Sequence, residues 1–449
     1  MARLFGTDGV RGVAGDDLTT GLAMLIGRGA ATVLTRETSH KPRILIGKDT
    51  RISGDMLEAA LAAGMCSVGA DVELLGVVPT PAVAYLVRKY KADAGIVISA
   101  SHNPMEFNGI KIFNGDGYKL PDSIEDEIDH LVHNKVEVTL AVGEAVGRIT
   151  RRDTAIDDYV DNLADCLQGA SFTGLRVAID CANGASAKPA QLLFERLGAE
   201  CHFIGIEPSG TNINADCGST HLGNLAHFVL ENHLDCGVAF DGDADRCLAV
   251  DEKGDEIDGD KIIAILAKHL KEQGKLPADT AVVTVMSNLG FMDYMRKTLG
   301  LKVATTAVGD RYVLEEMRAK GYAIGGEQSG HVILLDHCTT GDGELSAAFL
   351  LDILSRSGKQ MSELNGVYEK YPQVIVNIEA TPEQKAAYKE DEYIAGFIES
   401  EQQTLMGLGR VLVRVSGTEP KIRVMVEGRD MDAIHLAADR IAALIKERV

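Results

Sequence analysis

The chain repeats one order of local patterns three times, and few folds accommodate such a repetition. Each repeat contains an apolar strand, a helical pattern, a second strand, a second helix and a short strand that ends in a polar loop. The first strands read RILIGK, LRVAIDC and AVVTVMS, and the last read GIVIS, GVAFD and YAIGG. Right-handed crossovers place such loops at the carboxyl edges of their sheets. The sequence therefore predicts three similar α/β domains with mixed sheets, whose loops converge on a central cleft.

The pattern of predicted strands and helices changes near the C-terminal end of the chain. From about Tyr371, PQVIVNI predicts a strand and residues 382–403 a helix, and VLVRVSGTEPKIRVMVEG predicts two strands around a tight loop. A last amphipathic helix begins at Met431, so these patterns indicate a smaller α+β C-terminal domain. A chain of 449 residues is too long to fold around a single hydrophobic core. From the repeats and the C-terminal pattern we predict four domains: 1–154, 155–256, 257–370 and 371–449.

The charge balance restricts the partners. The chain has 45 Lys and Arg against 66 Asp and Glu, a formal charge of −21, which repels nucleic acid and anionic membranes at long range. No stretch approaches the roughly 18 apolar residues of a membrane span. The first residues lack the apolar core of a signal peptide, and none of the eight cysteines forms a C-x-x-C pair. We expect a cytoplasmic protein that binds a small anionic substrate through a local basic loop, with no nucleic-acid or membrane partner.

The first polar loop follows the strand GIVIS and contains a candidate nucleophile, Ser101. Pro104 prevents the strand from continuing, and a second short strand carries Lys111. Taken alone, a turn with incidental hydroxyls explains this stretch equally well. A serine-hydrolase site is rejected because no G-x-S-x-G elbow surrounds Ser101, and adjacent His102 points to the opposite face of an extended chain.

The second polar loop, DGDADR, places carboxylates on alternate residues: Asp241, Asp243 and Asp245. Alternate side chains of an extended loop point the same way, so all three can meet one cation. Oxygen ligands favour a hard ion, Mg²⁺ first. The alternative is a solvated acidic turn. Arg246 would bring a phosphate to the metal.

The remaining loops supply hydrogen-bonding and basic groups. GGEQSGH offers Glu327 and Ser329 for adjacent sugar hydroxyls and His331 for proton transfer, although a Gly-rich loop with a structural histidine is the commoner outcome. The basic loop RVSGTEPKIR has the parts of a phosphate site, against the alternative of a hairpin with charged edges. Near the N-terminus, FGTDGVRG adds Arg11 to glycines that permit close backbone approach.

Together these loops resemble those of the α-D-phosphohexomutase superfamily, over nearly the whole chain. That superfamily has a serine loop, a D-G-D-x-D-R metal loop, a G-E-x-S-G sugar loop and an R-x-S-G-T-x-P phosphate loop, and all four occur here in that order. FGTDGVRG, ISASHNP, GGEQSGH and RVSGTEP are most similar to the bacterial phosphoglucosamine mutases, with Gln328 the distinguishing position. The resemblance implies reversible conversion of glucosamine 6-phosphate to glucosamine 1-phosphate through a hexosamine 1,6-bisphosphate, on the route to UDP-N-acetylglucosamine.

The resemblance also implies roles for individual residues. Ser101 would be the phosphoserine and, with the three aspartates, would hold one Mg²⁺ per chain. Arg246, Glu327 and Ser329 would bind substrate, and Arg11, Lys111 and His331 match positions implicated in electrostatics and proton transfer. The phosphate that is not transferred would be held by five residues: Arg414, Ser416, Gly417, Thr418 and Arg423.

Alternatives remain at this point. The same chemistry on another sugar would make the protein a phosphomannomutase or phosphoglucomutase. A metal-dependent phosphatase with a phosphoserine intermediate belongs to another class, and the chain lacks the His-rich dinuclear ligand set expected there. A non-catalytic sugar-phosphate sensor would need neither Ser101 nor the aspartates. The sequence leaves open whether the chain forms a homodimer.

Overall fold

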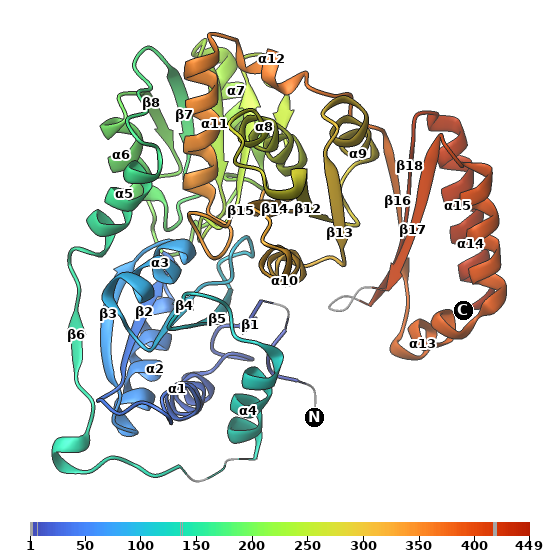
Figure 1. The fold of residues 1–449 in the computed structure, drawn as a ribbon. Helices are drawn as coiled ribbons and strands as arrows, with labels where there is room; N and C mark the ends of the chain where they lie inside the picture. Colours follow the sequence, from blue (N-terminus) through green and yellow to red (C-terminus); the bar gives the residue numbers. More distant parts are fainter. Residues whose placement is uncertain (1–2, 7, 135, 137, 416–419) are drawn as a thin grey trace. The chain divides into compact units, whose positions relative to one another are not determined.

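The chain forms two compact units, each with its own core (Figure 1). The larger comprises residues 1–286 and 301–367, and the smaller comprises 287–300 and 368–449. The computed structural model describes the following residues: 3–6, 8–134, 136, 138–415 and 420–449. In these ranges no helix is both long and apolar enough to cross a membrane.

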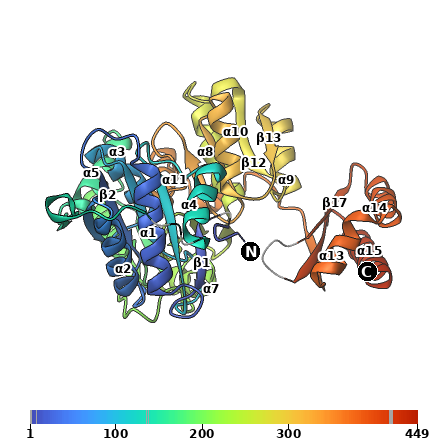
Figure 2. The ribbon, with the colours of Figure 1, turned by 90° about the horizontal axis from the view of Figure 1, so that it is seen from below.

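The first sheet has the strand order β1-β5-β4-β2-β3-β6, in which β1 and β5 run antiparallel to their neighbours. Ile44 and Ile46 of β2 contribute to a core formed with α1, α2 and α4, and α1 lies between α2 and α4 (Figure 2). On the other face of the sheet, α3 packs directly over the glycines of β2 and β4. A Cβ added at Gly47 or Gly95 would collide with Val83 of α3. The elements are β1 (Val10–Val13), α1 (Thr20–Leu34), β2 (Arg43–Lys48), α2 (Gly54–Ser67), β3 (Asp71–Val77), α3 (Thr80–Tyr90), β4 (Ala94–Ile98), β5 (Phe107–Asn114), α4 (Asp122–His133), η1 (Gly143–Ala145) and β6 (Ile149–Arg151).

The second sheet has the order β11-β10-β9-β7-β8, with β7, β8 and β9 parallel and β10 and β11 antiparallel. Strands β9 and β10 are buried along their whole length, so they read as continuous apolar runs rather than as an alternating pattern. The elements are α5 (Ala155–Cys166), β7 (Arg176–Asp180), α6 (Ala187–Arg196), β8 (Glu200–Ile204), α7 (Leu222–Glu231), β9 (Cys236–Phe240), β10 (Cys247–Asp251) and β11 (Glu256–Ile257).

The third sheet has the order β13-β12-β14-β15, with only β15 antiparallel among these described strands. Helices α8 and α10 pack against this sheet. Helix α11 packs against β15 and also against β9 and β10 of the second sheet, and α8 also contacts β10. The elements are α8 (Gly259–Glu272), η2 (Pro277–Asp279), β12 (Thr280–Thr284), β13 (Lys302–Thr306), α10 (Asp310–Lys320), β14 (Ile324–Gly326), β15 (Val332–Leu334), α11 (Gly343–Ser357) and α12 (Met361–Asn365).

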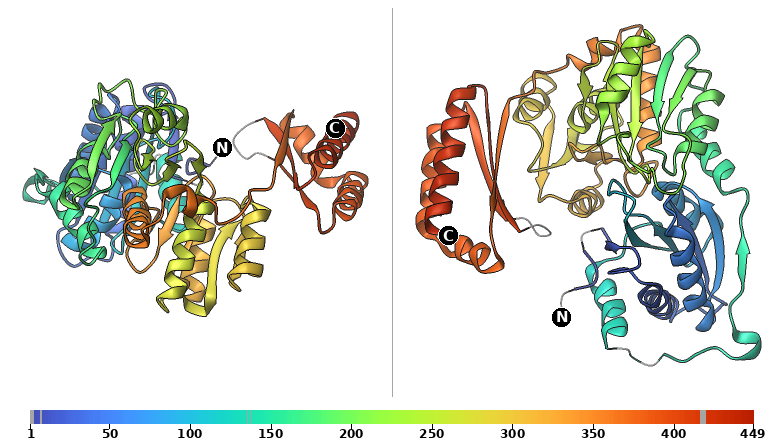
Figure 3. Two further views of the ribbon diagram at one scale, coloured as in Figure 1. Left: turned by 90° about the horizontal axis from the view of Figure 1, so that it is seen from above. Right: turned by 180° about the vertical axis from the view of Figure 1, so that it is seen from behind.

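The smaller unit is built on the antiparallel sheet β16-β18-β17, with α14 and α15 on one face (Figure 3). A segment from the third repeat, residues 287–300, belongs to this unit. Glu427 on β18 accepts a hydrogen bond from the backbone N–H of Leu289 at 3.0 Å, and Arg410 donates to the carbonyl of Ser287 at 2.6 Å. The elements are α9 (Leu289–Asp293), the π-helical turn η3 (Tyr294–Thr298), β16 (Gln373–Glu379), α13 (Pro382–Glu390), α14 (Glu392–Thr404), β17 (Gly409–Val415), β18 (Lys421–Gly428) and α15 (Met431–Arg448).

The predicted repetition is confirmed, and the sheets show its physical basis. In each sheet a central strand that pairs in parallel on one side is followed by an antiparallel neighbour: β4 by β5, β9 by β10 and β14 by β15. The serine, aspartate and Gly-rich loops are the connections of these three hairpins. The expectation of three similar α/β domains with mixed sheets and a smaller C-terminal α+β domain is therefore correct.

Candidate active site

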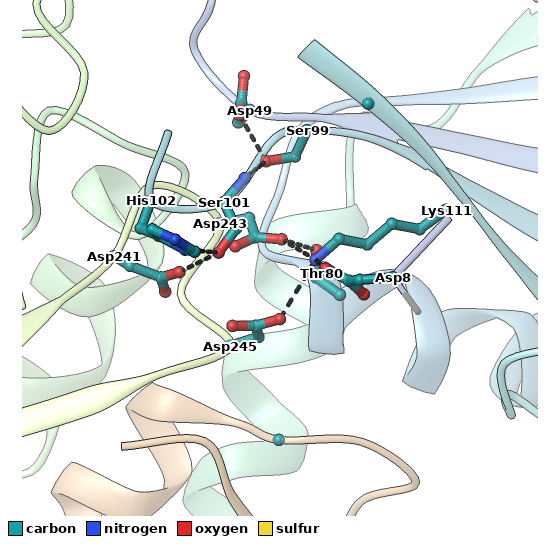
Figure 4. Close-up of polar contacts among 12 residues, drawn as sticks. Asp8, Asp49, Thr80, Ser99, Ser101, His102, Lys111, Asp241, Asp243 and Asp245 are labelled. Atoms are coloured by element: carbon teal, nitrogen blue, oxygen red, sulfur yellow. Dashed lines mark hydrogen bonds and ion pairs between the residues drawn. The ribbon is translucent and has the colours of Figure 1, made fainter. Parts of the chain in front are cut away.

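Ser101 occupies a tightly constrained turn directly after β4. Its φ is +52°, in the left-handed region that few side chains adopt without cost, as is typical of functional sites. The residue is 1% exposed. Its hydroxyl donates a hydrogen bond to Asp241 Oδ2 at 2.5 Å and lies 3.4 Å from Nδ1 of His102 (Figure 4). Burial, followed by the nearby Arg246 and Arg11, lowers the pKa of His102 to about 4, so this imidazole is neutral near pH 7.

A buried arginine holds the serine loop in this conformation. Arg51 donates to the backbone carbonyls of Ser101 at 3.0 Å and Asn103 at 2.7 Å, and also to those of Pro104 and Phe107. Its Nε bonds to Asp49 Oδ2 at 2.9 Å. The same carboxylate oxygen accepts from the Ser99 hydroxyl at 2.6 Å, and that hydroxyl accepts from the N–H of Ser101 (Figure 4).

Sequence reasoning missed Arg51 and Asp49, as well as Asn214, whose amide also donates to the Ser101 carbonyl at 2.8 Å. A signal existed for the first two. They lie in the polar segment KDTR at the end of β2, at the carboxyl edge where the other polar loops begin. Asn214 lies in a segment with no comparable pattern.

The three predicted metal ligands come together in the loop between β9 and β10. One oxygen from each of Asp241, Asp243 and Asp245 lies within 4.8 Å of the others, and all three residues are buried. In this tight turn Ala244 adopts a φ of +56°, in the left-handed region. Burial, followed by the neighbouring carboxylates of Asp245 and Asp243, raises the pKa of Asp241 to about 8.

The donor set suits a hard divalent cation. Thr80 donates to Asp243 Oδ2 at 2.5 Å, but the buried Oδ1 atoms of Asp243 and Asp245 accept no hydrogen bond from the described residues. Buried carboxylate oxygens without donors are costly, and a cation would offset that cost. The residues present therefore fit a magnesium site.

Lys111 forms ion pairs with the aspartate loop and with Asp8. It extends from β5, is 1% exposed, and its Nζ lies 2.8 Å from Asp243 Oδ2, 3.2 Å from Asp245 Oδ2 and 3.1 Å from Asp8 Oδ2 (Figure 4). Burial opposes its charge, but these carboxylates outweigh burial and hold the pKa of Lys111 well above its ordinary value. Arg11 pairs with Asp8 and donates to Asn103 Oδ1 at 3.0 Å. The ammonium and guanidinium are therefore fixed cations beside the serine loop.

His331, predicted as a proton carrier, lies beside the aspartate loop. Its Nδ1 is 3.6 Å from Asp245 Oδ1, and its Nε2 is 3.5 Å from Asp310 Oδ2 and accepts the N–H of Gly341 at 3.0 Å. Burial lowers the pKa of His331, but Asp245 and Asp310 outweigh it, so the pKa stands above the ordinary value. The bond from Gly341 favours the tautomer that carries its proton on Nδ1.

The structure brings only some of the sugar-loop residues into this network. Glu327 Oε1 accepts the N–H of Gly309 at 3.1 Å, and Ser329 is exposed. Gln328 donates to Asp258 Oδ2 at 3.2 Å. Arg246 is largely buried; its backbone N–H donates to Asp241 Oδ1 at 3.2 Å, and its Nε lies 3.9 Å from Asp245 Oδ1.

The basic loop belongs to the smaller unit. Arg414 on β17 and Arg423 on β18 are directly opposite in the antiparallel register, so their side chains share one face of the sheet. Ser416, Gly417 and Thr418, which complete the predicted phosphate site, lie outside the described residues.

Comparison with known proteins identifies the family of the chain. Four models of the phosphoglucomutase/phosphomannomutase family match in order: alpha/beta/alpha domain I at residues 2–139, domain II at 157–254, domain III at 258–371 and the C-terminal domain at 375–444. The fold is similar to a crystal structure of a phosphoglucomutase/phosphomannomutase family protein from Burkholderia thailandensis, with a TM-score of 0.84, 25% identity and coverage of 99% of this chain and 98% of that one.

Relatives identify the branch of that family. A phosphoglucosamine mutase of Ruminiclostridium cellulolyticum is 55% identical over 449 residues, and one of Thermoanaerobacter sp. is 53% identical over 449 residues. Each comparison covers 100% of this chain and 100% of the relative. The chain therefore belongs to the phosphoglucosamine mutases of the phosphoglucomutase/phosphomannomutase family.

Proposed function

We propose that the protein interconverts glucosamine 6-phosphate and glucosamine 1-phosphate, with Ser101 as a phosphoserine. Full-length identity of 53–55% to phosphoglucosamine mutases supports the substrate. The observation that carries the site assignment is the 2.5 Å contact between the Ser101 hydroxyl and Asp241, the first of three clustered carboxylates. A hydroxyl at this position can carry a phosphoryl group whose oxygens meet a bound cation.

The proposed cation is one Mg²⁺ per chain, held by Asp241, Asp243, Asp245 and a phosphate oxygen on Ser101. When bound, it would supply positive charge to offset that of the phosphoryl oxygens. A structurally similar Aspergillus fumigatus N-acetylphosphoglucosamine mutase, with a TM-score of 0.71 and 17% identity, was solved with GlcNAc-6P and magnesium.

The proposed reaction has two phosphoryl transfers. In the first, the C1 hydroxyl of glucosamine 6-phosphate attacks the phosphorus on Ser101. The new O–P bond forms as the P–Oγ bond breaks, the hydroxyl proton passes to a protein base, and the released Oγ takes up a proton. The product is the 1,6-bisphosphate and free Ser101. After the intermediate turns over, Ser101 Oγ gives its proton to a protein base and attacks the phosphorus of the C6 phosphate. The new Oγ–P bond forms as the P–O6 bond breaks, and O6 takes up a proton.

The side chains around Ser101 have separate proposed tasks. Lys111, Arg11 and Arg246 would stabilise charge on the transferring group, because fixed cations in a dry site act strongly on developing charge. His331 and Lys111 are the candidates for proton transfer. Glu327 and Ser329 would bind sugar hydroxyls.

The second phosphate of the intermediate needs its own binding site. We assign it to the C-terminal basic loop: Arg414, Ser416, Gly417, Thr418 and Arg423. Because the bisphosphate carries a phosphate at either end, the same loop would serve both transfers. The four proposed domains, 1–154, 155–256, 257–370 and 371–449, would each contribute one loop to this chemistry.

Phosphorus NMR of the purified protein would test the proposal. Glucosamine, glucose and mannose 1-phosphates are supplied separately with Mg²⁺ and a trace of hexose bisphosphate. We expect preferential conversion of the glucosamine compound to its 6-phosphate. Faster conversion of another sugar would overturn the substrate assignment, and release of inorganic phosphate would indicate a phosphatase.

Substitution of the serine tests the phosphoenzyme. Ser101→Ala should abolish turnover and leave the circular dichroism spectrum unchanged. Ser99→Ala keeps the nucleophile and should retain measurable turnover, lowered by the loss of its hydrogen bonds with Asp49 and the Ser101 N–H. Near-normal turnover by Ser101→Ala would exclude the phosphoserine mechanism.

A further inference from the structure

Two charged residues that the sequence analysis did not single out lie beside the candidate active site. Lys119 follows β5, and Asp310 is the first residue of α10. Lys119 Nζ lies 2.5 Å from Asp310 Oδ2 and 2.5 Å from Asp8 Oδ1. The Lys119 and Asp310 side chains are only 10% and 16% exposed. Ion pairs this well shielded from water depend strongly on their geometry, unlike pairs on the surface.

These contacts complete a ring of side chains that includes one residue of the aspartate loop, Asp245, and one of the Gly-rich loop, His331. Lys111 and Lys119 both contact Asp8, Lys111 contacts Asp245, and His331 lies between Asp245 and Asp310. Successive separations around the ring are 2.5, 2.5, 3.5, 3.6, 3.2 and 3.1 Å, in the order Asp8, Lys119, Asp310, His331, Asp245, Lys111 and back to Asp8. Acidic members alternate with basic ones around the ring. Half of the ring, His331, Asp245 and Lys111, belongs to the proposed machinery. Asp8 contacts Lys111 and Asp310 faces His331, and Lys119 bridges Asp8 and Asp310.

Lys119 and Asp310 are held at this point by contacts on either side. Arg311 donates to the carbonyl of Leu120 at 3.2 Å, and the guanidinium of Arg318 lies 3.8 Å from the ring centroid of Tyr118. The segment after β5 is thereby attached to α10 at three successive places along the chain. Of these three contacts, the Lys119–Asp310 ion pair is the one that forms part of the ring.

His331 is packed with little room to move. It is 3% exposed, and a Cβ added at Gly341 would come within 2.6 Å of the imidazole atoms. Asp310 Oδ2, which Lys119 holds at 2.5 Å, is 3.5 Å from the imidazole Nε2. Displacement of Asp310 would therefore remove one wall of the histidine site.

We propose that Lys119 and Asp310 are positioning residues that hold His331 and Lys111 in register for phosphoryl transfer. The inference rests on the proposed mutase activity. Misplacement of reacting groups by about 1 Å can cost about 100-fold in rate, and neither Lys119 nor Asp310 needs to contact the substrate. Loss of the pair should therefore lower kcat and leave KM nearly unchanged.

The test measures steady-state kinetics of two variants, Asp310→Asn and Lys119→Met, which remove the pair from opposite sides. We expect kcat to fall about 10- to 100-fold, with KM for glucosamine 1-phosphate within about threefold of wild type. The double variant should cost less than the product of the two single losses, because both substitutions remove the Lys119–Asp310 interaction. Lys119→Arg, which keeps the charge, should recover most of kcat.

A matched control separates positioning from general weakening of the interface. Arg318→Met removes a neighbouring contact between the same two segments without touching the ring, and kcat should stay within twofold of wild type. The inference is overturned if the folded pair variants keep wild-type kcat, if only KM changes, or if Arg318→Met loses as much kcat. An inactive wild-type enzyme would instead overturn the proposed function, and this inference with it.

Discussion

Replacement of Arg51 is the perturbation for which the structure gives the clearest magnitude. The side chain is fully buried in an ion pair with Asp49, and its guanidinium donates to four backbone carbonyls as well as to that carboxylate. In Arg51→Lys the charge remains, but three donors replace five. At least two acceptors then lose their hydrogen bonds. Each buried acceptor left unsatisfied costs about 1–3 kcal/mol, so we expect a loss of about 2–6 kcal/mol in unfolding free energy.

The same substitution should lower turnover by at least 10-fold, because three of the carbonyls, those of Ser101, Asn103 and Pro104, belong to the serine loop, and these contacts fix the conformation of Ser101. Arg51→Met also leaves the Asp49 carboxylate unpaired, which typically costs 3–5 kcal/mol, and should be the more severe variant. Urea unfolding followed by circular dichroism measures the stability, and phosphorus NMR measures the turnover.

Arg36→Lys is the matched control for this experiment. Arg36 also pairs with a carboxylate, that of Glu127, but its side chain is 51% exposed. Its conversion to lysine should change stability by less than about 0.5 kcal/mol. If Arg51→Lys behaves like Arg36→Lys in both assays, the backbone contacts of Arg51 do not stabilise the serine loop and the reasoning fails.

Other residues give further predictions. Glu344 is fully buried and neither carboxylate oxygen has a hydrogen-bond partner among the described residues, so Glu344→Met should raise the unfolding free energy by about 1–3 kcal/mol; a lower value in urea titrations would contradict this. Burial raises the pKa of Asp342 to about 6 from 3.8, so its contribution to stability is lost as the pH rises towards about 6. Asp342→Asn should therefore gain up to about 3 kcal/mol over wild type between pH 4 and 7, and a pH-independent difference in melting temperature would refute it. Arg414→Ala should raise KM at least 10-fold, since a hydrogen bond to a charged group contributes about 1.5–3 kcal/mol, and an unchanged KM would remove this residue from the site.

The repeated topology and the loops at the hairpin connections could be predicted from the sequence, because both depend on local patterns. Residues that join the loops could not. Arg51 and its carbonyl acceptors are about 50 positions apart, and Lys119 and Asp310 are 191 apart, and no periodicity of apolar residues reports such pairings. The roles of individual site residues stay predictions.

Local detail differed where side chains compete with the helix backbone. The helix expected over 382–403 divides at Asp391, whose carboxylate accepts the N–H groups of Tyr393 and Ile394 and begins α14 anew. Helix α9 passes into a π-helical turn at Tyr294. Residues Val10–Val13, part of a segment interpreted as a Gly-rich loop, pair with β5 as β1, because tertiary pairing overrides local propensity.

The exchange of residues 287–300 into the smaller unit bears on how the protein can be divided. The chain passes between the two units three times, after residues 286, 300 and 367. A fragment that begins at Tyr371 would lack the segment whose Leu289 N–H satisfies the buried Glu427 carboxylate. The complementary fragment would retain that segment without its packing partner. The C-terminal domain therefore cannot be separated intact by dividing the chain at one position. A split or domain-swapped enzyme would have to carry α9 and η3 together with the C-terminal sheet.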